Sequence, residues 1–152
     1  MSQTRNAQIQ PDRSGILTTG FPKSALLRVF RLQMQSIDVP AKHGWMRALA
    51  YAQQVWGRPI GAQVFSEMAV LMDRVMTARR SPMGYGNPDC ECCANRINPL
   101  EGYLLNVIAA QWAGKPTQAE GFALFLSEAN GPDQLVKAAA RVAGLLPKPQ
   151  AN

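Results

Sequence analysis

The longest helical pattern in the chain covers residues 59–80 and consists of PIGAQVFSEMAVLMDRVMTARR. Apolar side chains recur there at three- and four-residue intervals, which is typical of an amphipathic helix with one buried face. Pro59 suits a first helical turn, and Pro82 prevents continuation beyond Arg80. We therefore expect this helix to be central to the fold, with a continuous apolar face made of Ile60, Val64, Met68, Leu71 and Val75, widened by Phe65, Met72 and Met76.

The sequence before this pattern predicts two shorter helices. The first covers about residues 22–36 and the second about residues 39–56. Asp38 is a candidate N-cap for the second helix, and Gly57 is suited to end it. An aromatic stripe in this region can line a ligand pocket, but its helical spacing favours a place in the core. The stripe contains Trp45, Trp56 and Phe65, together with the neighbouring methionines.

Three more helices are predicted after a connector over residues 81–97. The first has a strong start signal, because Asn98 is followed by Pro99 and by Glu101 at the third helical position. Thr117 and Glu120 have the same capping-box spacing at the start of the next helix, and a last helix extends from about Pro132 to Leu146. No segment shows sustained strand-like alternation, so we expect an all-α, single-domain bundle of about six helices.

Length and composition support one soluble globular domain. The chain has 152 residues, of which 47% are apolar and 17% charged. No apolar run approaches the roughly 18 residues of a membrane span, and the polar N-terminus has no signal-peptide core. We expect a cytoplasmic protein with a flexible tail at residues 1–20, a helical domain at 21–147 and a frayed C-terminus at 148–152.

All three cysteines of the chain lie in the connector, where Cys90, Cys92 and Cys93 form a C-x-C-C cluster. Such clustering is improbable by chance and calls for a physical reason. Three explanations remain open. In a redox switch, Cys90 pairs with one of the other two, because adjacent Cα atoms lie about 3.8 Å apart, below the usual disulfide range. The second explanation is a metal site, and the third is simple packing.

A metal site requires a fourth ligand to complete tetrahedral zinc coordination. His43 is the sole histidine and can complete a Cys3His set with Cys90, Cys92 and Cys93, while Asp89 and Glu91 are local substitutes. Packing is the third explanation, since cysteine behaves as a small apolar residue. The cluster then anchors the connector against the helix that begins at Pro99, either through its side chains or through a metal.

The distribution of charge offers a further clue to partners. The first 80 residues carry 11 Lys and Arg against four Asp and Glu, whereas the remainder carries five against six. A basic half can bind nucleic acid or an acidic protein surface, although the basic residues are dispersed rather than clustered. The chain contains no nucleophile elbow, phosphate loop or zinc-protease motif, so we expect no enzymatic activity.

Residues 88–93 have the sequence PDCECC and are followed by Arg96, Pro99, Glu101 and the pair Leu104–Leu105. A cysteine triplet just before a helix with an acidic capping residue resembles a family of small helical proteins, chiefly from sphingomonad-type alphaproteobacteria, that has no assigned activity. The resemblance covers about residues 65–146, and this chain differs by having Glu91 inside the triplet. It implies a bacterial, cytoplasmic, helical protein.

These observations support three functional hypotheses. The first is a non-enzymatic helical interaction module that binds a protein partner or itself. The second is a nucleic-acid-binding regulator that uses the basic first half of the chain. The third is a thiol or zinc sensor that uses the C-x-C-C connector.

Overall fold

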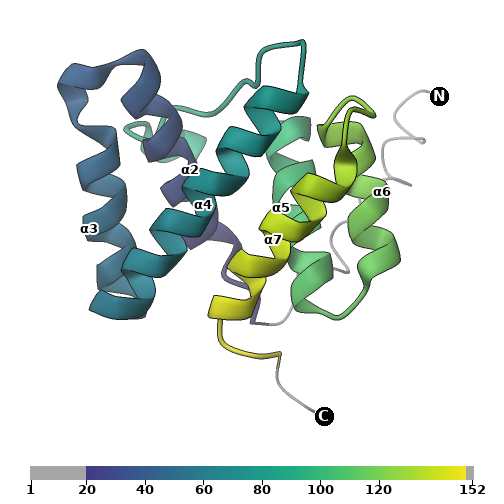
Figure 1. Cartoon of the computed structure of the whole chain (residues 1–152). Coiled ribbons are helices and arrows are strands. Elements are labelled where there is room, and N and C mark those ends of the chain that lie inside the picture. Colours follow the sequence, from purple (N-terminus) through teal and green to yellow (C-terminus); the bar gives the residue numbers. More distant parts are fainter. Residues whose placement is uncertain (1–19, 150–152) are drawn as a thin grey trace.

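The computed structural model describes residues 20–149, and all regular secondary structure in that range is helical (Figure 1). This confirms the prediction of an all-α, single-domain bundle with about six helices. Residues 1–19 of the predicted tail and residues 150–152 of the predicted frayed end lie outside the described residues. The helices are α2 (Lys23–Asp38), α3 (Gly44–Trp56), α4 (Arg58–Ala78), α5 (Pro99–Trp112), α6 (Pro116–Leu126) and α7 (Pro132–Leu145), with short 3-10 turns η1 (Pro40–Lys42) and η2 (Glu91–Cys93).

Helix α4 connects the two halves of the bundle. It packs against α3 and α2 on one side and against α7 on the other, while α5 packs against α6 and α7 (Figure 1). Its predicted apolar face is largely confirmed, because Val64, Met68, Leu71 and Val75 are buried. Ile60 and Met76 were predicted on the same face but are 36% and 40% exposed.

The segment between α2 and α4 differs from the prediction of one continuous helix. Asp38 ends α2 instead of capping the next helix, and its carboxylate accepts a hydrogen bond from the Tyr85 hydroxyl at 2.7 Å. His43 adopts a left-handed conformation with φ of 55°, which separates η1 from α3. The chain therefore turns sharply at this point, and α3 begins only at Gly44.

Small residues, rather than the predicted aromatic stripe, form the buried face of α3. Gly44, Ala48 and Ala52 are buried, whereas Trp45 is 53% exposed. A Cβ atom at Gly44 would overlap the Leu32 carbonyl of α2, so the two helices approach too closely to accommodate a large side chain. The prediction that Trp45 belongs to the core is therefore wrong.

The start of α5 confirms the predicted capping box, but the start of α6 does not. The Asn98 side chain accepts from the Glu101 backbone N–H at 2.8 Å, and Glu101 accepts from the Asn98 N–H at 3.1 Å. Helix α6 begins earlier than predicted, at Pro116, and Lys115 precedes it without a side-chain cap. Thr117 is therefore already inside the helix, because the proline occupies the first helical position.

The described helices do not include a membrane-spanning segment: over residues 20–149, none is both long enough and apolar enough to cross a bilayer.

Candidate functional site

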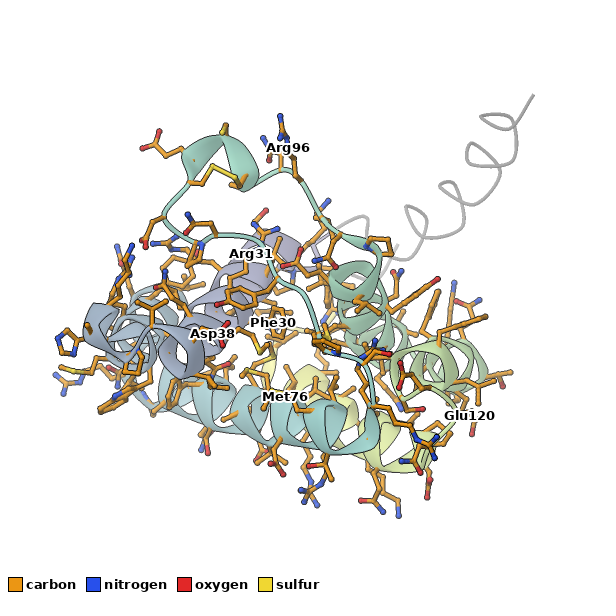
Figure 2. All side chains as sticks on the ribbon, turned by 90° about the horizontal axis from the view of Figure 1, so that it is seen from above. Phe30, Arg31, Asp38, Met76, Arg96 and Glu120 are labelled. Atoms are coloured by element: carbon orange, nitrogen blue, oxygen red, sulfur yellow. A yellow bond between two sulfur atoms is a disulfide. The ribbon has the colours of Figure 1, made fainter. Side chains whose placement is uncertain are left out.

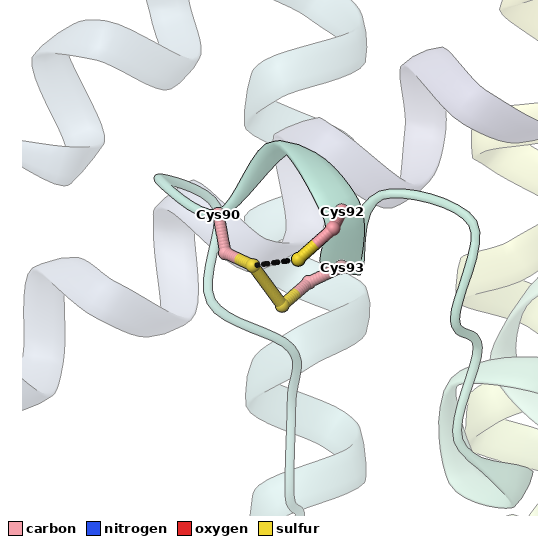
Figure 3. A group of neighbouring side chains, drawn as sticks. All are labelled: Cys90, Cys92 and Cys93. Carbon is pink, nitrogen blue, oxygen red and sulfur yellow. Dashed lines mark hydrogen bonds between the residues drawn. A yellow bond between two sulfur atoms is a disulfide. The ribbon is translucent and has the colours of Figure 1, made fainter.

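The three cysteines lie together at the tip of the connector between α4 and α5. Cys90 and Cys93 form a disulfide with Cα atoms 5.2 Å apart, and Cys92 is a free, exposed thiol (Figure 3). The Cys92 Sγ lies 3.2 Å from the Cys90 Sγ, and all three sulfur atoms lie within 4.8 Å of one another. This is compatible with the predicted redox pairing of Cys90 with another member of the cluster.

The pairing also exposes a motif that the C-x-C-C description overlooked. Cys90 and Cys93 are three residues apart and thus form a C-x2-C pair, the spacing of dithiol redox motifs and of many zinc sites. The 3-10 turn η2 brings positions i and i+3 to the same side of the chain. The spacing alone was sufficient to identify the C-x2-C motif, whereas the choice of Cys93 over Cys92 as the partner of Cys90 comes from the structure.

The structure gives the packing explanation little support, because none of the three cysteines is fully buried: Cys90 and Cys93 are half-buried and Cys92 is exposed. The turn projects from the helical body, with its disulfide near the outer end of the connector (Figure 2). A different set of interactions must therefore fix this part of the chain.

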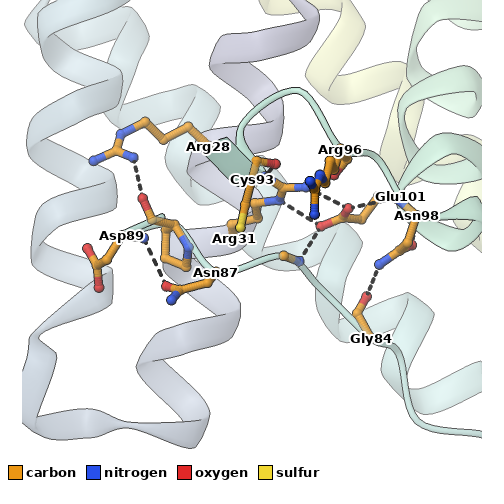
Figure 4. A network of polar contacts seen from close by, with 11 residues as sticks. Arg28, Arg31, Gly84, Asn87, Asp89, Cys93, Arg96, Asn98 and Glu101 are labelled. Atoms are coloured by element: carbon orange, nitrogen blue, oxygen red, sulfur yellow. Dashed lines mark hydrogen bonds and ion pairs between the residues drawn. The ribbon is translucent and has the colours of Figure 1, made fainter. Parts of the chain in front are cut away.

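Arg31 of α2 provides the central anchor of the connector. Its Nε and Nη2 donate to the two carboxylate oxygens of Glu101, at 2.8 and 2.9 Å (Figure 4). Its Nη1 donates to the Cys93 carbonyl at 3.0 Å, and Nη2 also donates to the Arg96 carbonyl at 2.6 Å. The anchor is therefore a buried arginine that binds backbone carbonyls at Cys93 and Arg96, and not the side chains of the cysteines.

Glu101 completes this anchor from the first turn of α5. Its carboxylate also accepts from the backbone N–H groups of Gly86 and Asn98, at 2.8 and 3.1 Å. Burial alone would raise the pKa of Glu101, but the hydrogen bonds from Arg31, Gly86 and Asn98 outweigh it and hold the pKa below its ordinary value. A side chain at Gly86 would overlap the Arg31 guanidinium, so the connector passes directly over the arginine.

A second anchor lies at Asp89, immediately before the cysteines. Its carboxylate accepts hydrogen bonds from Arg47, Gln35 and Lys42. The Arg47 hydrogen bond, followed by that of Gln35, holds the pKa of Asp89 well below its ordinary value. Beside it, Arg28 Nη1 donates to the Pro88 carbonyl at 2.9 Å (Figure 4).

These contacts explain much of the uneven charge of the sequence. The ion pairs Arg31–Glu101, Arg47–Asp89 and Arg79–Glu128 each join a basic residue of the first half to an acidic residue of the second half. Several of the basic side chains that suggested a nucleic-acid partner are therefore engaged within the fold.

Of the four predicted metal ligands, the structure brings together only the three cysteines. Among the described residues, the sole group suited to hold a metal is Cys90, Cys92 and Cys93, and it does not include His43. His43 is exposed in the turn before α3. Asp89, a predicted substitute, is occupied by its basic partners. The Cys3His set is thus not assembled.

A cavity of about 170 Å³ adjoins the disulfide, between the connector and helices α2 and α3. Its lining includes Ser24, Arg28, Tyr51, Cys90 and Asn95. The Arg28 guanidinium lies 5.4 Å from the centre of the Tyr51 ring, a cation–π contact at the cavity wall. The cavity therefore combines a positive charge, an aromatic ring and one cysteine of the disulfide.

The predicted aromatic stripe contributes to a separate open groove of about 260 Å³ between α2, α3 and α4. Trp45, Phe65, Met72 and Met76 line it together with Ile37. Trp56, the other member of the stripe, packs half-buried against the core.

Comparison with protein-family models, curated proteins and solved structures finds no match to this chain. The resemblance to the alphaproteobacterial family therefore stays a prediction.

Proposed function

We propose that the chain is a non-enzymatic, thiol-based sensor. Its cysteines alternate between a Cys90–Cys93 disulfide and three free thiols, and the reduced set binds a thiophilic metal ion such as zinc. The observation that supports this proposal is the gathering of three sulfur atoms within 4.8 Å on a turn where Cys92 is exposed and Cys90 and Cys93 are half-buried. Cysteines that serve packing alone are typically buried, where the side chain acts as a small apolar group and the thiol is inert.

The redox half of the proposal depends on whether small thiols can reach the cysteines and on the redox state of the compartment that holds the protein. Cys92 is exposed and both cysteines of the disulfide are half-buried, so soluble thiols can reach the site. In the cytoplasm that the sequence analysis predicts, disulfides are usually transient and serve catalysis or sensing. Reduction adds two electrons and two protons, which convert the disulfide into two thiols.

The metal half depends on the spacing of the sulfur atoms. Zn–S bonds of about 2.3 Å in a tetrahedron place the sulfurs roughly 3.8 Å apart. Three sulfurs already within 4.8 Å need only small side-chain rotations to reach that spacing. Because the described chain supplies no fourth ligand within this group, a water molecule or a partner residue would complete it.

Zinc titration of the reduced and oxidised full-length chain tests the proposal. We expect the reduced chain to retain zinc through gel filtration and the oxidised chain to lose it, since a disulfide cannot supply thiolates. Cys92→Ser and Cys93→Ser should each weaken zinc binding, whereas the matched control His43→Asn should not.

Two results would contradict this proposal. One is equal zinc binding by the oxidised and reduced chains. The other is a reduced chain that neither binds zinc nor re-forms the Cys90–Cys93 disulfide under mild oxidation.

A second candidate function is self-association through the open groove. Ile37, Trp45 and Met76 are each at least 40% exposed beside it, which is unusual for a cluster of large apolar side chains. Sedimentation over a range of concentrations tests this function. We expect Trp45→Ser to weaken association and Phe125→Ser, which removes an exposed apolar side chain from α6, to leave it unchanged. A wild-type chain that stays monomeric throughout would exclude it.

We do not extend the proposal to nucleic acid. Arg31, Arg47 and Arg79 engage internal acceptors, so the basic half offers fewer free cations than its sequence suggests.

A further inference from the structure

The cavity beside the disulfide is small, and only one of the two disulfide cysteines lines it. Its volume of about 170 Å³ is below the roughly 300–1,000 Å³ of pockets for drug-sized ligands. Among the three cysteines only Cys90 lines the cavity, so a molecule bound there lies against Cys90 and not against Cys93. A ligand of this site would therefore be a small molecule whose reactive end reaches Cys90.

Arg28 gives the cavity a chemical preference. Among the described residues it has no carboxylate partner, in contrast to Arg31 and Arg47, which pair with Glu101 and Asp89. Within the described part of the chain, Arg28 donates one hydrogen bond to the Pro88 carbonyl and lies over the Tyr51 ring. A guanidinium has five N–H donors, so Arg28 can still bind a carboxylate.

We propose that this cavity binds a small thiol that carries a carboxylate, and that this thiol reduces the disulfide at Cys90. The inference depends on the proposed thiol-sensor function and adds the chemical class of the reductant. Arg28 holds the carboxylate and acts as a positioning residue, while Cys90 is the sulfur that is attacked.

The reaction balances in two exchange steps. The thiolate of the bound molecule attacks the Cys90 Sγ, a mixed disulfide forms, and the Cys90–Cys93 bond breaks. Its electron pair passes to the Cys93 Sγ, which takes up a proton from solvent. A second molecule of the same thiol then attacks the small-molecule sulfur of the mixed disulfide. The two small molecules leave joined as a disulfide, and the Cys90 sulfur takes up a proton and becomes a thiol. Two small thiols are oxidised and one protein disulfide is reduced.

Cys92 offers a competing fate for the mixed disulfide. Its sulfur lies 3.2 Å from the Cys90 Sγ, so the Cys92 thiolate can attack the Cys90 sulfur, form a Cys90–Cys92 disulfide and expel the small thiol as a thiolate. The protein stays oxidised until two further small thiols reduce this second disulfide by the same two exchange steps. The mixed disulfide should therefore persist longer in Cys92→Ser than in the wild-type chain.

Reduction kinetics with three small thiols test the inference. The probes are 3-mercaptopropionate, 2-mercaptoethanol and cysteamine, which are similar in size but anionic, neutral and cationic. Rates on the oxidised full-length chain are measured by alkylation and mass spectrometry, and are divided by the rates on a small reference disulfide to remove intrinsic thiol reactivity. We expect the normalised rate for 3-mercaptopropionate to exceed that for cysteamine by about fivefold or more, the effect of one charge-assisted contact of about 1 kcal/mol.

Variants separate a specific role of Arg28 from a general charge effect. Arg28→Gln should abolish the preference, and Arg28→Lys should restore part of it. Arg141→Gln, which removes an equal charge from an exposed position on α7, should leave the preference unchanged. Ser24→Trp should slow all three thiols, because Ser24 lines the cavity and is exposed.

Equal normalised rates for the three thiols in the wild-type chain would overturn this inference alone, since the disulfide would still cycle. A preference that survives Arg28→Gln would do the same. A disulfide that no thiol reduces would overturn the proposed sensor and this inference with it.

Discussion

Arg31 of α2 and Glu101 of α5 form a buried ion pair, with Arg31 Nε 2.8 Å from Glu101 Oε2 and side chains 3% and 0% exposed. The pair also binds the backbone of the cysteine-bearing connector at Gly86, Cys93, Arg96 and Asn98. Two charged residues 70 positions apart thus position a loop whose own side chains are largely exposed.

Arg31→Met should destabilise the fold by about 3–5 kcal/mol, the usual cost of leaving one member of a buried ion pair unpaired. Chemical denaturation at neutral pH measures the loss, and the exposed control Arg141→Met should change the free energy of unfolding by less than about 0.5 kcal/mol. Proteolysis between Met83 and Arg96 should also accelerate in Arg31→Met. A destabilisation below about 1 kcal/mol would show that the pair is not an anchor.

Acidification should destabilise the native chain through Glu101. Its pKa in the folded state lies below the ordinary value of 4.5, so the carboxylate stabilises the fold above that value. The stabilisation is lost as the pH falls below about 4.5 and through the folded pKa, because protonation then breaks the Arg31 ion pair. Urea denaturation at a series of acidic pH values measures this dependence. Glu101→Gln should be less stable at neutral pH and show a shallower loss on acidification; an unchanged slope would assign the acid sensitivity to other groups.

Tyr85 should titrate later than an ordinary tyrosine. Burial, together with the hydrogen bond to the nearby Asp38 carboxylate and its negative charge, raises the pKa of Tyr85 to about 12. The protonated phenol is favoured in the folded state, so its contribution to stability is complete below the ordinary pKa of 10.0 and is lost as the pH rises toward 12. Ultraviolet titration should show a phenol component at this high pH that Tyr85→Phe removes. A component that remains in Tyr85→Phe would belong to another tyrosine.

Leu71 and Met76 of α4 should respond very differently to truncation. Leu71 is fully buried, so Leu71→Ala should cost about 2–5 kcal/mol through lost burial and a residual cavity. Met76→Ala removes a side chain that is already 40% exposed and should cost less than about 1 kcal/mol. Thermal or urea denaturation distinguishes the two, and similar losses would contradict the assignment of Met76 to the surface.

Gly61 and Gly144 should show opposite effects when replaced by alanine. A Cβ atom at Gly61 would overlap the backbone of α3 at Ala52 and Gln53, whereas none of the described residues lies within 4 Å of such an atom at Gly144. Gly144→Ala should therefore stabilise α7 by about 0.5–1 kcal/mol, the gain in helix propensity. Gly61→Ala should destabilise the protein in spite of the same gain. A stabilising Gly61→Ala would mean that α3 and α4 can separate at little cost.

The periodicity of α4 and the capping box of α5 were visible in the sequence because both depend on local spacing. Val64, Met68, Leu71 and Val75 share a helical face wherever the helix lies, and Asn98 reaches Glu101 within a single turn. The clustering of the cysteines was equally local, since a C-x2-C pair closes over one 3-10 turn. Helix content, the start of α5 and the position of the thiol site therefore followed from residues close together in the chain.

The tertiary structure decided which of these local features face the interior and what holds them. Trp45 and Ala48 belong to one helix, but only contact with α2 determined that the alanine is buried and the tryptophan exposed. Glu101 was identified as a capping residue, yet its partner Arg31 lies 70 positions away and no spacing rule connects them. Burial and ion pairing depend on segments that meet only after the chain has folded, so the anchor of the cysteine loop and the Arg28 cavity beside it emerged only in three dimensions.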